Sequence, residues 1–227
     1  MTTRLDVVIP TLNAAASLGR TIAALATPAG LSLTITVCDG GSSDGTPSIA
    51  RQAGARVLTA PAGRGRQLAA GADAGEAPWL LFLHADSRPG AGWGETVRRF
   101  AAGTDREDRA AYFRLRFDSA DRRARRIERL VDWRCRTFGL PYGDQGLVMA
   151  RTFYRRLGGY SAAPLMEDVE LVRRIGRRRL VPLDADMITS ARRYERDGWV
   201  LRPLRNLSCL ALYLAGMPPG VVQRLYG

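Results

Sequence analysis

The stretch LDVVIPTLNAAASLGRTIAAL, residues 5–25, decides the fold class. Residues 5–10 are apolar and mostly β-branched apart from one Asp, and the run ends in Pro, which predicts a buried strand. Residues 17–25 carry apolar side chains at helical spacing. A buried strand followed at once by a helix is the repeating unit of a parallel sheet covered by helices.

The same alternation continues through the first half of the chain. Further strands are expected at 33–37, 56–59 and 79–83, and helices at 46–54 and 66–74. Ligands of such sheets bind beyond the carboxyl ends of the strands. Functional residues should therefore lie just after each strand, in segments 11–13, 38–43, 61–66 and 84–86.

The second half is less regular. Strands are expected at 112–117 and 146–150, a long basic helix at 121–138, and shorter helices up to 157 and at 170–175. Apolar residues at 204, 207, 211 and 214 predict an amphipathic helix over 201–214. Since no repeat or linker interrupts the chain, we expect one α/β domain with this helix at its C-terminal end.

Composition limits the classes of partner. Of the 227 residues, 46% are hydrophobic, enough for a sizeable core, and the formal net charge is +12 with Arg as the only basic residue apart from one His. Arg binds phosphate oxygens bidentately and stays charged. Such a chain suits a polyphosphate ligand, an anionic membrane face or nucleic acid.

We expect neither a targeting signal nor a membrane span. Three cysteines form no CxxC pair, which indicates a reduced, intracellular protein. The N-terminus runs directly into a strand, so no signal peptide is expected. The longest apolar stretch, 207–217, is too short to cross a bilayer.

Two glycine-rich segments follow predicted strands. In CDGGSSDGT (38–46), Asp39 is a candidate to accept hydrogen bonds from a nucleobase or ribose, and Gly41 allows close approach of a ligand. An Asx turn is the alternative. In GRGRQ (63–67), Arg64 and Arg66 precede a helix N-terminus, which favours anions. A solvated basic loop fits that segment equally well.

Acidic and basic residues follow the later strands. In LHADS (83–87), Asp86 is a candidate ligand for a divalent cation beside a diphosphate, and the single histidine, His84, adjoins it. In LMEDVE (165–170), Asp168 is either a carboxylate base or a helix cap. The Arg pair in TSARRY (189–194) either closes over a diphosphate or is ordinary basic surface.

Taken in order, the segments VVIPTLNAAASL, CDGGSSDGT, GRGRQLAAGADAG, LFLHADS and GGYSAAPLMEDVELVRR resemble family 2 glycosyltransferases. The closer resemblance, through LHADS, PYGDQG, LMEDVEL and TSARRYERDG, is to the radical-SAM/selenodomain-associated transferase 2 subfamily. It implies the GT-A fold, a Rossmann-like and mostly parallel central sheet flanked by helices. It also implies an inverting transfer of sugar from a nucleotide diphosphate sugar to an unknown acceptor.

The resemblance implies roles by position. Asp168 would be the catalytic base, with Glu167 beside it, and Asp86 with His84 would hold Mg²⁺ or Mn²⁺. The residues implied in binding the nucleotide sugar, with UDP-sugars favoured over GDP-sugars, are Pro10, Thr11, Asn13, Asp39, Gly41, Arg64, Arg66, His84, Ala85, Asp86, Arg192 and Arg193. Those implied in binding the acceptor are Tyr142, Gly143, Asp144 and Gln145.

The same resemblance divides the single domain, 1–227, into three parts. Residues 1–100 would bind the nucleotide sugar, 101–197 the acceptor and catalytic groups, and 198–227 would form a helical appendage. The sequence departs from the family at His84, which replaces the first acid of a D-x-D element, and it lacks the Q-x-x-R-W element of processive synthases. These departures favour single transfers and leave metal dependence open.

Other functions fit parts of the sequence. A nucleotidyltransferase would share the sheet, but it needs a basic Gly-rich loop after the first strand, where Thr11-Leu12-Asn13 stand. A basic protein that binds membrane or nucleic acid without catalysis would use 122–136 and 201–214. We expect a cytoplasmic enzyme without a nucleic-acid partner. Peripheral contact with the inner membrane face and a homodimer stay open.

Overall fold

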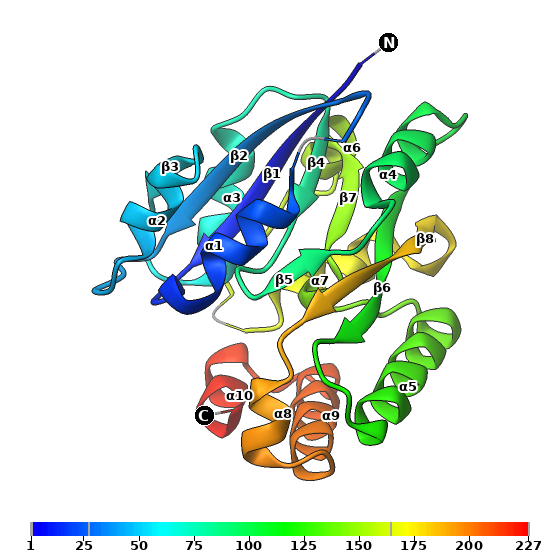
Figure 1. Cartoon of the computed structure of the whole chain (residues 1–227). Coiled ribbons are helices and arrows are strands. Elements are labelled where there is room, and N and C mark those ends of the chain that lie inside the picture. Colours follow the sequence, from blue (N-terminus) through cyan, green and yellow to red (C-terminus); the bar gives the residue numbers. More distant parts are fainter. Residues whose placement is uncertain (1, 27, 164, 227) are drawn as a thin grey trace.

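The computed structural model describes residues 2–26, 28–163 and 165–226. A single twisted sheet runs through the molecule and helices pack on both of its faces (Figure 1). This is the α/β, GT-A-like architecture predicted above. The C-terminal helices gather with α5 at one end of the molecule.

The first half alternates strand and helix as predicted. Its elements are β1 (Thr3–Thr11), α1 (Ala15–Ala24), β2 (Leu31–Asp39), α2 (Thr46–Gln52), β3 (Arg56–Thr59), α3 (Arg64–Asp73) and β4 (Trp79–Phe82). Asp6, the one acid in the first strand, is buried, and its carboxylate lies 2.5 Å from the guanidinium of Arg151. The pair is satisfied further by the backbone of Ala77, so β1 tolerates a buried charge.

The second half mixes strand directions. Its elements are β5 (Ser87–Pro89), α4 (Trp93–Ala102), β6 (Ala110–Phe117), α5 (Arg122–Phe138), a 3₁₀ turn (Gly143–Gln145), β7 (Leu147–Ala150), α6 (Arg151–Arg156), α7 (Glu167–Ile175), a second 3₁₀ turn (Arg177–Arg179), β8 (Leu180–Thr189), α8 (Arg192–Asp197), α9 (Leu201–Leu214) and α10 (Pro219–Tyr226). Helix α4 was not predicted, although Trp93, Val97 and Phe100 give it a buried face at helical spacing.

The strand order is β3-β2-β1-β4-β7-β6-β8-β5. Strands β1 to β4 are mutually parallel, β7 runs antiparallel to both of its neighbours, and β6 is parallel to β8. Strand β5 pairs antiparallel with β8 and joins Ser87 to Thr189. The carboxyl ends of β1, β2, β4 and β8 therefore face the same edge, where the predicted site residues lie.

The C-terminal region differs from the prediction in two respects. Three helices, α8 to α10, follow β8 in place of the one expected. In α9 the apolar positions that mark an amphipathic helix point to solvent: Leu204 is 54% and Leu207 60% exposed. The buried side chains are Arg202, Cys209 and Leu210. The helix was predicted correctly, but a stripe of leucines that resembles a core face lies outside the core.

Candidate functional site

The carboxyl ends of β1 and β2 are joined through Asp39. Its carboxylate is buried and accepts four hydrogen bonds, from Thr11 Oγ1 (2.9 Å), the Ser42 hydroxyl (2.5 Å), and the N–H groups of Gly41 (3.1 Å) and Ser42 (2.8 Å). Burial acts to raise the pKa of Asp39, but these hydrogen bonds outweigh it and lower the pKa. Asp39 is an ionised group that holds the 39–42 turn.

The loop after β1 is fastened to the loop after β2. Asn13 adopts a left-handed backbone conformation (φ 52°), its N–H donates to Ser42 Oγ, and its side-chain oxygen accepts from the Ser43 N–H at 2.9 Å. The Ala15 N–H donates to Asp44. Pro10 is buried within β1. Thr11, Asn13, Asp39 and Gly41 therefore meet on one pair of loops, as predicted.

Gln67 on α3 is a structural part of this edge that sequence reasoning missed. Its buried side-chain amide donates to the carbonyl oxygens of Thr11 and Cys38, both at 2.7 Å. The amide thereby links the carboxyl ends of β1 and β2. The segment GRGRQ contains this residue, but a Gln inside a helix carries no signal for a contact of this kind.

Arg64 and Glu167 form an ion pair between the N-termini of α3 and α7. The Nε atom of Arg64 lies 2.8 Å from Glu167 Oε1, and the Glu167 side chain is fully buried while that of Arg64 is partly exposed. Gly65 allows α3 to lie close to the segment that precedes α7, since a Cβ on Gly65 would clash with the Ser161 carbonyl oxygen. Glu167 Oε2 has no hydrogen-bond partner in the described parts of the chain. Burial, and then the charge of Asp168, raise the pKa of Glu167 to about 7.

Asp168 and His84 meet across Gly143. The Gly143 N–H donates to Asp168 Oδ2 at 2.8 Å. A Cβ on Gly143 would lie 2.4 Å from His84 Nε2 and 3.4 Å from Asp168 Oδ2, so only glycine fits between them. A cavity of about 10 Å³ adjoins these three residues together with Glu167 and Tyr160. The structure thus joins the LHADS, PYGDQG and LMEDVEL segments at one point.

His84 is neutral at physiological pH. Burial is the main reason, and the charge of Arg64 adds to it, so that the pKa of His84 falls to about 4 against the opposing effects of Asp86 and Asp168. The charge of Arg193 on α8 lowers this pKa as well, which places Arg193 within electrostatic reach. A neutral imidazole keeps a lone pair for a cation or a proton.

Asp86 lies in the turn between β4 and β5. Its backbone carbonyl accepts from the Ser190 N–H at 3.2 Å, and the Ala85 carbonyl accepts from Thr21 on α1. The turn is thereby held against the end of β8, from which Arg192 and Arg193 continue. Arg66 and Arg192 are exposed at the same edge. The Asp86 side chain itself is partly exposed.

Asp144, which was predicted to bind the acceptor, interacts electrostatically with the charged residues of this cluster. Burial, with the negative charges of Asp168 and Asp86, raises its pKa to about 6 against the effect of Arg134. Its Oδ1 atom is buried and lacks a hydrogen-bond partner among the described residues. Asp144 and Glu167 are therefore two carboxylates whose charge the fold does not fully neutralise.

The other two predicted acceptor residues are held by the protein itself. The Arg134 guanidinium stacks on the Tyr142 ring, 3.5 Å from its centroid. Gln145 is only 1% exposed, and its amide donates to the Phe113 carbonyl and accepts from the Tyr142 N–H. Gln145 thus fixes the 143–145 turn that presents Gly143 and Asp144.

No preformed metal centre accompanies the cluster. Within 2–26, 28–163 and 165–226, no group of three or more His, Cys, Asp or Glu side chains is arranged to hold a metal ion. The 84–86 turn offers one acid, Asp86, and its side chain is partly exposed. A cation at this edge would have to take most of its ligands from a bound molecule or from water.

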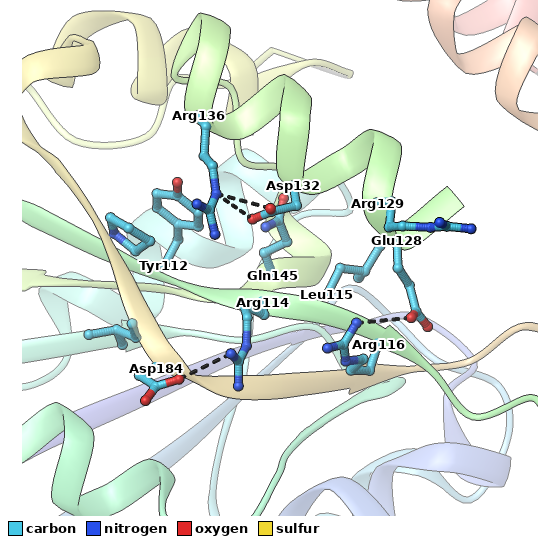
Figure 2. Close-up of a pocket in the computed structure, with 12 residues that line it drawn as sticks. Tyr112, Arg114, Leu115, Arg116, Glu128, Arg129, Asp132, Arg136, Gln145 and Asp184 are labelled. Carbon is cyan, nitrogen blue, oxygen red and sulfur yellow. Dashed lines mark hydrogen bonds and ion pairs between the residues drawn. The ribbon is translucent and has the colours of Figure 1, made fainter. Parts of the chain in front are cut away.

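A larger cavity, about 420 Å³, lies between α5 and strands β6 and β8 (Figure 2). Three of the arginines that line it are engaged by acids: Arg114 with Asp184, Arg116 with Glu128, and Arg136 with Asp132. Its wall includes Gln145 but none of the predicted donor-site or catalytic residues. This cavity is therefore separate from the cluster around Asp168.

Comparisons with known proteins agree with this architecture. The family model described as glycosyl transferase family 2 matches residues 6–161. A search of curated protein sequences found no match. Among solved structures, glucosyl-3-phosphoglycerate synthase from Mycobacterium tuberculosis, in complex with Mn²⁺, UDP and glucosyl-3-phosphoglycerate, is 18% identical with a TM-score of 0.57, and the alignment covers 83% of this chain and 70% of that one.

Two further structures are similar. A mannosyltransferase from Pyrobaculum calidifontis, in complex with GDP-Man and Mn²⁺, is 16% identical with a TM-score of 0.64, covering 92% of this chain and 61% of that one. Residues 1–349 of S. aureus TarS, in complex with UDP-GlcNAc, are 14% identical with a TM-score of 0.58, covering 83% and 58%. The chain thus spans about 60% of the length of these two solved chains.

Proposed function

The chain belongs to glycosyltransferase family 2, and from that premise we propose that it moves a sugar from a nucleotide diphosphate sugar to a hydroxyl acceptor by a single, inverting displacement. The observation that carries the proposal is the meeting of Asp168, His84 and Gly143 beside Asp86, at the edge where the strands end. We also assign the chain to the radical-SAM/selenodomain-associated transferase 2 subfamily, because two motifs of that resemblance supply the Gly143–Asp168 hydrogen bond.

Asp168 is the base in this proposal. The acceptor oxygen forms a bond to the anomeric carbon, the bond from that carbon to the diphosphate oxygen breaks, and the acceptor proton passes to Asp168. The carboxylate is partly exposed. Its Oδ2 atom accepts from the Gly143 N–H, and its Oδ1 atom accepts from the Val169 N–H in the first turn of α7. General-base catalysis of this kind contributes about 10²–10⁴-fold in rate.

Arg64 and Glu167 act as a pair. The buried Glu167 carboxylate holds the guanidinium of Arg64 at the start of α3, where a diphosphate would also benefit from the helix N-terminus. Arg193, and with it Arg66 and Arg192, would add positive charge from the same edge. Preorganised charges of this kind stabilise the negative charge that develops on the leaving diphosphate.

A divalent cation fits this edge in one way. Mg²⁺ is often held by one or two carboxylates together with substrate phosphates and water. Asp86 is suited to be that carboxylate, with neutral His84 beside it, and the bound cation would neutralise diphosphate charge. The neighbouring structures from M. tuberculosis and P. calidifontis contain Mn²⁺.

The donor half of the proposal uses residues 1–100. Thr11, Asn13, Asp39 and Gly41 would surround the nucleoside, and we favour UDP-sugars over GDP-sugars because two of the three solved relatives above hold UDP or a UDP-sugar. The acceptor would enter from the 101–197 side, over Tyr142, Gly143 and Asp144. A cytoplasmic enzyme is expected, since nucleotide sugars are the proposed substrate.

A thermal-shift screen tests the donor. The purified chain is heated with UDP-, GDP-, dTDP- and CDP-sugars in Mg²⁺, Mn²⁺ or EDTA. A ligand of the native state at about 100 times its Kd adds about 2.7 kcal/mol of stability. Stabilisation by one nucleotide supports the proposal, and loss of the shift in EDTA supports the cation. No shift with any donor would contradict the proposed function.

Two variants make the screen specific. Asp86→Ala is expected to remove the part of the shift that depends on the cation. Asp184→Ala, at an exposed carboxylate beside the separate cavity, serves as the matched control and is expected to shift like the unmodified chain. Equal shifts in both variants would argue against Asp86 as the cation ligand.

A further inference from the structure

Exposed large apolar side chains are concentrated at one end of the molecule. Apart from Leu12, every such residue among those described belongs to α5, α9, α10 or the segments that adjoin them: Leu130, Trp133, Phe138, Val200, Leu201, Leu204, Leu207, Leu214, Val221 and Leu225. Scattered surface leucines need no explanation, but a cluster of this size marks a binding surface. We call this set the apolar end face.

Helix α9 gives the face its main stripe. Leu201, Leu204, Leu207 and Leu214 follow one another at helical spacing, and Leu201 is 70% exposed. The opposite side of the helix, through Cys209 and Leu210, is buried in the protein. The leucine stripe is therefore exposed on a helix whose opposite face is already packed. Rotating α9 to bury the leucines would expose Cys209 and Leu210.

Within residues 198–227 the charges are of one sign. Arg205 and Arg224 are exposed, Arg202 is buried and paired with Asp197 of α8, and there is no Asp or Glu. On α5, Arg126 and Arg129 are exposed around Leu130 and Trp133, and the one acid between these two residues, Asp132, is paired with Arg136. Trp133 is 57% exposed and packs edge-on against Phe138, with 5.3 Å between ring centroids. Leucine, tryptophan and phenylalanine beside arginines are the composition of helices that lie in the membrane interface.

The two parts of the face belong to one end of the structure. Buried residues of α5, such as Val131 and Cys135, share a cluster with Trp199, which lies two residues before the start of α9. Figure 1 shows α5 and α8–α10 together at that end, away from α2 and β3.

The apolar end face is joined to the candidate active site. Cys209 of α9 and Val222 of α10 pack in one cluster with Leu165, and Met166 packs against that cluster. The next two residues are Glu167 and Asp168. The helices that carry the exposed leucines therefore also support the segment that supplies the proposed base.

We propose that the apolar end face docks on the surface of an anionic membrane, with the leucines of α9 in the interface and the arginines against lipid phosphates. The helices of the described parts of the chain are too short or too polar to cross a bilayer, so the contact is peripheral. The cytoplasmic leaflet, which is negatively charged, is the surface of matching sign. Resting on the proposed function, the acceptor would then be a lipid-linked hydroxyl presented at that surface.

The charge of this region favours an anionic lipid surface over a second copy of the chain as the partner that covers the apolar end face. If two copies met through α9, the exposed Arg205 and Arg224 of each copy would add positive charge, with no acid of residues 198–227 to offset it. Like charges brought together across an interface are unfavourable. An anionic lipid surface covers the leucines and neutralises the arginines at the same time.

Vesicle flotation of the full chain, without any nucleotide, tests the proposal. One sample contains phosphatidylcholine vesicles and the other contains vesicles with phosphatidylglycerol. The chain is expected to float with the anionic vesicles, and at least about tenfold less in the double variant Leu204→Glu/Leu207→Glu. Both leucines are exposed, so the variant is expected to keep its melting temperature and circular dichroism spectrum.

A charge-matched control separates docking from net charge. Ser48→Glu/Gln52→Glu adds the same two negative charges at exposed positions of α2, and it is expected to float like the unmodified chain. Equal loss of flotation in both double variants would overturn the docking face. So would absence of flotation with anionic vesicles, or a dimer that light scattering detects in the unmodified chain and not in Leu204→Glu/Leu207→Glu.

The two proposals fail separately. Flotation without any donor-induced thermal shift would leave the docking surface and remove the glycosyl-transfer proposal. A clear donor shift without flotation would do the opposite.

Discussion

Asp39 and Glu167 are buried carboxylates at the same edge of the sheet, but they differ in their hydrogen-bond partners and in the direction of their pKa shifts. Asp39 accepts four hydrogen bonds from its own and neighbouring loops, and its pKa is lowered. Glu167 has one cationic neighbour, an oxygen without a partner in the described chain, and a pKa raised to about 7. The first is stabilised by the fold alone, whereas the second is not.

The difference separates scaffold from reaction site. A carboxylate with every lone pair engaged, such as Asp39, holds two loops in place. Carboxylates left incompletely paired, like Glu167 and Asp144, cost folding energy, and perturbed groups of this kind cluster at functional sites. The region around Asp168 is thus where charge from a substrate and its cation would complete the structure.

The largest expected effect is on turnover. Asp168→Asn keeps an oxygen for the Gly143 N–H but removes the base, so we expect donor turnover to fall about 10³-fold. Donor affinity, measured by titration calorimetry, should stay the same. Asp73→Asn, at an exposed position of α3, is the control. Turnover within a few fold of the unmodified chain would exclude Asp168 as the base.

The next effect is on stability and concerns the scaffold side. Asp39→Ala leaves the Thr11 and Ser42 hydroxyls and two backbone N–H groups without their acceptor. Since a buried donor left unpaired costs about 1–3 kcal/mol, we expect the free energy of unfolding in urea to fall by about 3 kcal/mol. Asp73→Ala should change it little. A similarly small change in Asp39→Ala would mean that the loops do not depend on this carboxylate.

The smallest effect has the opposite sign and depends on pH. Glu167 has a folded-state pKa of about 7 against an ordinary value of 4.5. Between these pH values the native state binds more protons than the unfolded state, so the free energy of unfolding falls as pH rises from about 4.5 to about 7. Glu167→Gln removes the ionisation. We expect the variant to match the unmodified chain at pH 5 and to exceed its stability by about 1 kcal/mol at pH 8.

Glu170→Gln, a partly exposed position on the same helix, is the control for this experiment, and no pH-dependent difference is expected from it. Urea unfolding at pH 5 and pH 8 measures both variants. A loss of stability in Glu167→Gln at pH 8 would show that the ion pair with Arg64 outweighs the burial of the charge, and the contrast with Asp39 would then disappear.

The first half of the fold was predictable because its signals are local. Each buried strand is followed by a helix with its own periodicity, and the rule for parallel sheets then placed Thr11, Asp39 and Asp86 at one edge. Gln67 was missed because its role depends on two carbonyls that come together only when β1 and β2 pair. The buried state of Glu167 depends similarly on the approach of α3 permitted by Gly65.

The second half depended on pairings that the sequence does not mark. The antiparallel insertion of β7 between β4 and β6 joins strands far apart in the chain, and nothing in 147–150 indicates its direction. In α9, periodicity predicted a helix with an apolar face, but whether that face is covered depends on the rest of the fold. The leucines at 204 and 207 were found in solvent.

The stereochemistry of sugar release tests single displacement at Asp168 most directly. With an α-linked nucleotide sugar chosen by the thermal-shift screen and water as acceptor, proton NMR in the first minutes identifies the anomer formed. The account predicts the β anomer from the unmodified chain and almost none from Asp168→Asn. Initial release of the α anomer, or undiminished release by Asp168→Asn, would contradict it.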